Sequence, residues 1–126
     1  MTTVLIVGGK GLKGMKSALE DAGYEVREAT KTVEVFDRVK KGEVDVIIVD
    51  SNMPTIKTNE MLPGLRRITK IPIIVVGRGG EHALVQSLKA GADYYVSRLV
   101  SQQELVERVR ALLRREQWNE NKRVRI

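Results

Sequence analysis

VIIV, residues 46–49, is an unbroken apolar run in which every side chain is β-branched. VLIV at residues 4–7 and IPIIVV at residues 71–76 are two further runs of the same kind. Short apolar runs of this composition are typical of strands that are buried on both faces of a parallel sheet. YEVRE at residues 24–28 and YYVS at residues 94–97 are more mixed, which is typical of edge strands. The sequence therefore predicts three central strands and two edge strands.

In the gaps between these strands, apolar residues recur at the spacing of an α-helix. The five expected helices carry the sets Leu12, Met15, Leu19 and Ala22; Val35, Phe36 and Val39; Met61, Leu65 and Ile68; Leu84, Val85 and Leu88; and Leu105, Val109 and Leu112. Gly23, Gly42 and Gly91 follow three of these sets, at positions where glycine commonly ends a helix. Ser101 and Glu104 have the spacing of a capping box, which indicates where the last helix begins.

Strands and helices that alternate in this way predict an α/β fold, namely a (βα)5 doubly wound parallel sheet with strand order 2-1-3-4-5. In such a sheet, ligands meet the carboxyl ends of the strands where the strand order reverses, here between the first and third strands. Residues 8–11 and Asp50 follow these two strands. We therefore expect them to share one crevice.

The composition is that of one globular domain: 126 residues, 42% hydrophobic and 30% charged. We expect the domain to span residues 1–116, with residues 117–126 as a basic C-terminal tail formed by a fraying helix end. No apolar run approaches the length of a membrane helix and no signal-peptide pattern is present, so we expect a cytoplasmic protein without membrane contact. The chain has no cysteine and a single histidine, His82, which argues against thiolate chemistry, a histidine metal site and a catalytic triad.

The net charge of +6 is compatible with an acidic partner such as nucleic acid. Part of the excess is local, because seven basic residues crowd the C-terminal region: Arg108, Arg110, Arg114, Arg115, Lys122, Arg123 and Arg125. Charge alone supplies no element that reads a nucleic-acid groove. We therefore do not expect nucleic acid to be the partner.

A glycine-rich loop, Gly9-Lys-Gly11-Leu-Lys-Gly14, follows the first strand and matches the G-x-G-x-x-G pattern of dinucleotide-binding loops. Glu28 lies 19 positions after Gly9, near the place of the ribose-binding acid in such proteins. A glycine-exposed helix start also attracts simple anions, for which Gly9, Lys10, Gly11 and Gly14 are the candidate binding residues. The loop alone leaves open whether it binds an anion, binds a nucleotide, or has another origin.

Three segments together resemble the receiver domain of two-component response regulators. They are VDVIIVDSNMP at residues 44–54, IPIIVVG at residues 71–77 and KAGADYYVSRLVSQQELVERVRALLRR at residues 89–115. The resemblance runs from about Thr3 to Arg115 and implies a flavodoxin-like fold with Asp50 at the phosphoacceptor position. It also implies a stand-alone signalling module of the phosphorelay family rather than an enzyme, with any output supplied by another molecule.

The same resemblance shows departures from the family pattern. Gly8 and Gly9 stand where the family has two acids that hold Mg²⁺, Gly77 stands at the position of the switch hydroxyl, and Arg98 stands in place of a lysine. Because Mg²⁺ binds through carboxylates and waters, we expect its binding to be weak or absent, with no metal site and no cofactor. Arg98 or Lys10 is expected to neutralise Asp50, the alternative being a hydrated Asp50 and a solvent-facing Arg98.

The resemblance further implies a protein partner, either a kinase or an output protein. In the family, the fourth helix, fifth strand and fifth helix commonly form a dimer or output surface, which here corresponds to His82–Arg115. Tyr95, Arg98, Arg108 and Arg110 are the candidate contact residues. Three functions remain open: a pseudo-receiver that acts by protein contacts without phosphorylation, a conventional regulator phosphorylated on Asp50, and an anion or nucleotide sensor.

Overall fold

The computed structural model describes residues 1–8 and 12–124, with the backbone alone described after Gln117. The strands are β1 (Thr3–Val7), β2 (Glu25–Ala29), β3 (Val46–Asp50), β4 (Ile73–Gly77) and β5 (Tyr94–Ser97). The helices are α1 (Met15–Asp21), α2 (Thr32–Lys40), α3 (Thr58–Ile68), α4 (Glu81–Ala90) and α5 (Gln102–Val124). Within the described ranges, none of these helices combines the length and the hydropathy that a bilayer crossing requires.

The strands form one parallel sheet in the order β2-β1-β3-β4-β5, which confirms the predicted topology. Every residue of β1, β3 and β4 is buried, whereas β2 and β5 both contain exposed positions. The distinction between continuous and mixed apolar runs therefore identified the central and edge strands correctly, because only a strand covered on both faces needs apolar side chains at every position.

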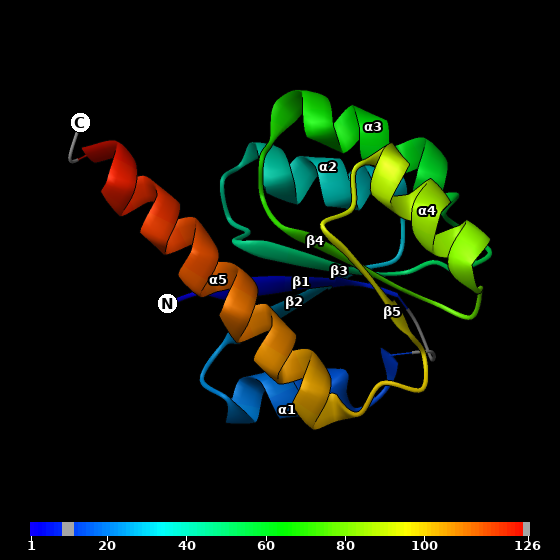
Figure 1. The fold of residues 1–126 in the computed structure, drawn as a ribbon, viewed down its shortest axis with the longest axis horizontal. Helices are drawn as coiled ribbons and strands as arrows, with labels where there is room; N and C mark the ends of the chain where they lie inside the picture. Colours follow the sequence, from blue (N-terminus) through cyan, green and yellow to red (C-terminus); the bar gives the residue numbers. More distant parts are fainter. Residues whose placement is uncertain (9–11, 125–126) are drawn as a thin grey trace.

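Helices cover the sheet on both faces, with α1 and α5 on one side and α2, α3 and α4 on the other (Figure 1). Side chains alternate along each central strand, so that Leu5 and Val7 pack with α2 and α3 while Val4 and Ile6 pack with α1 and α5. The two resulting cores lie on opposite faces of one sheet. In sheets of this kind, sites form at the carboxyl ends of the strands.

The predicted helix ends are present. The Ser101 hydroxyl accepts a hydrogen bond of 3.0 Å from the backbone N–H of Glu104. Gly23, Gly42 and Gly91 have φ angles of 98°, 71° and 131°, a backbone conformation that favours glycine. Helix α5 continues to Val124 and so includes residues 117–124, for which we expected a fraying helix end.

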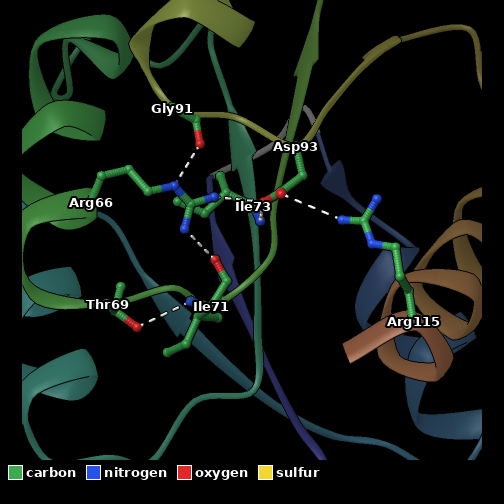
Figure 2. A network of polar contacts seen from close by, with 7 residues as sticks. All are labelled: Arg66, Thr69, Ile71, Ile73, Gly91, Asp93 and Arg115. Atoms are coloured by element: carbon green, nitrogen blue, oxygen red, sulfur yellow. Dashed lines mark hydrogen bonds and ion pairs between the residues drawn. The ribbon is translucent and has the colours of Figure 1, made fainter. Parts of the chain in front are cut away.

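A network around Arg66 joins the end of α3 to the amino-terminal edge of the sheet (Figure 2). The Arg66 guanidinium donates from Nε to the Gly91 carbonyl at 2.7 Å and from Nη1 to the Ile71 carbonyl at 2.6 Å. It also donates from Nη2 to Asp93 Oδ2 at 2.6 Å, and Arg115 of α5 lies 3.5 Å from the other oxygen of Asp93. One planar side chain therefore connects α3, the segment before β4 and the turn before β5.

Candidate functional site

The site is centred on Asp50, the last residue of β3, at the carboxyl edge of the sheet. Only 4% of Asp50 is exposed, and Gly8 lies directly beside it after β1. A Cβ built on Gly8 would be 3.0 Å from Asp50 Cβ and 3.2 Å from Leu12 Cδ1. The structure thus brings Gly8 and Asp50 together at the carboxyl edge of the sheet, as predicted, and the absence of a side chain at residue 8 permits the close approach.

Among the described residues, two groups contact the Asp50 carboxylate. The backbone N–H of Asn52 donates to Oδ1 at 3.0 Å, and Arg98 Nη1 lies 3.6 Å from the same oxygen. The side chains of Asp50 and Arg98 are 5% and 19% exposed, so the ion pair is largely shielded from water. Arg98, one of the two cations that we expected here, is held in place because its backbone N–H donates to the Gly77 carbonyl. The other candidate, Lys10, lies outside the described residues.

The donor set around Asp50 does not fit Mg²⁺. This ion is held by carboxylates and waters in near-octahedral geometry, and Gly8 has no side chain to offer. Gly9 lies outside the described residues. Across the described ranges, no group of three or more His, Cys, Asp or Glu side chains is placed to hold a metal ion. Among the described residues, Asp50 provides the carboxylate at this edge of the sheet, and it already faces the Arg98 guanidinium.

Gly77, the last residue of β4, lies against the side chains of Tyr95 on β5 and of Ser51, the residue that follows β3. A Cβ on Gly77 would overlap the Tyr95 hydroxyl oxygen and would lie 2.6 Å from Ser51 Oγ. The Ser51 hydroxyl donates to the Val76 carbonyl at 3.0 Å. The space that a side chain at residue 77 would need is therefore filled by Tyr95 of β5 and by Ser51, which follows β3.

Tyr95 on β5 is half-buried and turned toward the loop between β4 and α4. Its hydroxyl accepts a 2.9 Å hydrogen bond from the backbone N–H of Gly79. A cavity of about 460 Å³ lies beside it, between α3 and α4, with Ser51, Arg78 and Ser87 also on its walls. The sequence indicated Tyr95 only as a candidate contact residue. Its packing against Gly77 has no signature in the sequence.

The glycine-rich loop is described only in part, because Gly9, Lys10 and Gly11 lie outside the described residues. Gly14 has a φ of 91° and precedes α1, and a Cβ there would overlap the amide of Gln102. Backbone conformation and close packing thus both favour glycine at this position. Glu28 is exposed on the edge strand β2. Anion or nucleotide binding at this loop stays a prediction.

The fourth helix exposes all three of the apolar residues that marked it in the sequence. Leu84, Val85 and Leu88 are 36%, 36% and 41% exposed, which is high for large apolar residues in a helix packed on a sheet. On α5, which covers the opposite face of the sheet, Arg108 lies over the Tyr94 ring, 5.6 Å from its centroid, and Arg110 forms an ion pair with Glu107. The predicted contact surface is therefore apolar on α4, while these two arginines of α5 already have partners within the chain.

The structure is a doubly wound five-stranded domain with a buried aspartate at the end of β3. Residues 10–110 match the model of the response regulator receiver domain. The chain belongs to the response regulator receiver domain family.

Its relatives include transcriptional regulators. The chain is 37% identical over 102 residues to the phosphate regulon transcriptional regulatory protein PhoB of Pseudomonas aeruginosa, covering 78% of this chain and 44% of that protein. It is 34% identical over 107 residues to the transcriptional regulatory protein CpxR of Escherichia coli, covering 84% of this chain and 46% of that protein. The chain thus spans about half the length of the curated relatives it matches.

The fold is also that of solved receiver domains. A CheY-like response regulator receiver domain protein from Methanospirillum hungatei superposes with a TM-score of 0.85 at 25% identity, covering 94% of this chain and 98% of that one. The flavodoxin-like fold expected from the resemblance is confirmed.

Proposed function

We propose that the protein is an atypical, cytoplasmic receiver module that signals through protein contacts without phosphorylation of Asp50, and that it is not an enzyme. The observation that carries the proposal is the environment of Asp50: a buried carboxylate, 3.6 Å from Arg98, beside a residue without a side chain. In this arrangement, the cation beside Asp50 is a guanidinium.

The physical reason is electrostatic. Phosphoryl transfer to a carboxylate depends on a cation that neutralises the moving oxygens, and Mg²⁺ ordinarily does this. A divalent ion that approached Asp50 would meet the positive charge of Arg98 and gain no second carboxylate from Gly8. Moving Arg98 away would break a shielded ion pair, which typically costs several kcal/mol when one partner is removed. Both effects oppose the metal-bound state.

A conventional, phosphorylated regulator is the alternative. Asp50 stands at the carboxyl end of β3, the edge at which ligands of such sheets bind, and this position favours the alternative. This alternative requires donors other than residue 8 to complete the shell of the metal ion. The geometry described above supports the first proposal better.

We place the contact surface on α4 and the end of β5. Leu84, Val85 and Leu88 expose apolar surface on α4, and Leu99, which follows β5, is 94% exposed. Exposed large apolar side chains that gather on one surface are typical of protein interfaces. We propose that this surface binds a kinase or output protein, or a second copy of the chain.

Recovery of the partner from the native cells tests the proposal. Tagged Asp50→Asn is expected to recover the partner as well as the wild type does, because no phosphoryl group is needed. Leu88→Glu is expected to reduce recovery by about tenfold or more, because it places a charge in an apolar contact. Val33→Glu on α2, where Val33 is 78% exposed, is the matched control and is expected to behave as the wild type. Loss of the partner with Asp50→Asn would refute phosphorylation-independent binding.

A further inference from the structure

The position of the Tyr95 ring depends on the absence of a side chain at residue 77. The ring carbon Cε2 of Tyr95 would lie 2.8 Å from a Cβ on Gly77, and the hydroxyl oxygen would overlap it. Real Cβ atoms do not come this close to other heavy atoms, and interiors packed at crystal density do not absorb such an overlap. A residue larger than glycine at position 77 and the observed position of Tyr95 therefore exclude one another.

The hydroxyl of Tyr95 is fixed at its far end as well. It accepts from the Gly79 N–H at 2.9 Å and donates to the Gly79 carbonyl at 3.4 Å, so both polar groups of that residue meet one side chain. Gly79 itself is closely packed, since a Cβ there would overlap Ala83 Cβ in the first turn of α4. Tyr95 thus connects β5 to the loop that leads into α4.

We infer that the space beside Gly77, here called the Tyr95 seat, fixes Tyr95 permanently in its observed position. Tyr95 in turn holds the β4–α4 loop and the start of α4 in one conformation, whatever the state of Asp50. The seat needs no phosphoryl group, because its contacts are the Tyr95 ring, the Gly77 backbone and the Gly79 peptide. The inference deepens the proposed function: if glycine at residue 77 fixes the conformation of α4, the contact surface on α4 is formed without phosphorylation of Asp50. Only this consequence rests on the proposed function; the seat itself does not.

NMR spectroscopy of the full chain, without a phosphodonor, tests the seat. In the wild type, we expect a nuclear Overhauser effect between the Tyr95 ring protons and the α-protons of Gly77. In Gly77→Ala, this contact is expected to disappear, and the Gly79 amide is expected to exchange with solvent about tenfold faster because its acceptor has moved. Gly80→Ala is the matched control, since a Cβ on Gly80 would meet nothing within 4 Å, and it is expected to keep the contact.

Two further variants keep the test decisive if Gly77→Ala does not fold. Tyr95→Phe removes the hydroxyl but leaves the ring, so the ring contact is expected to persist while Gly79 exchange accelerates. Asp50→Asn is expected to keep both the contact and the slow exchange. The inference is overturned if folded Gly77→Ala keeps the contact, if Tyr95→Phe leaves Gly79 exchange unchanged, or if Asp50→Asn abolishes the contact. Phosphorylation of Asp50 in a separate experiment would refute the proposed function and leave this result standing.

Discussion

Replacement of Arg66 with alanine is expected to lower the free energy of unfolding by about 2–4 kcal/mol. Its guanidinium makes three hydrogen bonds of 2.6–2.7 Å, to the carbonyls of Gly91 and Ile71 and to the Asp93 carboxylate. The substitution leaves all three acceptors without this donor. The magnitude is kept below that of a fully buried pair because the side chains of Arg66 and Asp93 are 24% and 27% exposed.

Urea denaturation followed by circular dichroism measures this effect, and Arg67→Ala is the control. Arg67 is exposed on the same helix, so its replacement is expected to change stability by no more than about 0.5 kcal/mol. Arg66→Lys is expected to fall between the two, because an ammonium keeps the charge but lacks the planar fork that reaches three acceptors. Equal stability of Arg66→Ala and Arg67→Ala would show that the network in Figure 2 does not hold these elements together.

Replacement of Gly8 with aspartate is expected to destabilise the protein by about 2–4 kcal/mol in the absence of divalent cations. A Cβ at residue 8 comes within 3.0 Å of Asp50 Cβ, and the new carboxylate adds a second negative charge beside a buried one. The two carboxylates together begin to form a cation site. Addition of about 10 mM Mg²⁺ is therefore expected to restore about 1 kcal/mol or more, by preferential binding to the folded state.

Gly8→Asn separates volume from charge in this experiment. Asparagine has nearly the same shape as aspartate, so the difference between the two variants reports the like-charge repulsion at Asp50. The wild type and Gly8→Asn are expected to show no specific stabilisation by Mg²⁺. If Gly8→Asp were as stable as Gly8→Asn and indifferent to Mg²⁺, the crevice would not have the electrostatic character inferred here.

The fold could be predicted from the sequence because its determinants are local and periodic. A central strand such as residues 46–49 must be apolar at every position, and the capping residue Ser101 marks a helix start by its chemistry. The strand order then follows from the rule for crossover handedness and from which runs are mixed. The meeting of Gly8 and Asp50 follows in turn from the order, since β1 and β3 are neighbours.

The contacts within the site could not be predicted to the same extent. The sequence left Arg98 and Lys10 as alternative partners of Asp50, because the reach of a long side chain depends on the rotamers it adopts. Tyr95 fills the space that Gly77 leaves, and the sequence does not show which side chain fills the space beside a glycine. The Arg66 network was missed because two of its acceptors are backbone carbonyls, which every residue has.

Intact-mass analysis after incubation with a small-molecule phosphodonor and millimolar Mg²⁺ tests the central claim most directly. Asp50→Asn serves as the unmodifiable control, and a receiver domain known to accept the donor, treated in parallel, shows that the reagent is active. Because Arg98 neutralises Asp50 and Gly8 offers no carboxylate, the wild type is expected to remain unmodified, like Asp50→Asn. A phosphoryl adduct that forms on most wild-type molecules, maps to Asp50 and requires Mg²⁺ would contradict the account.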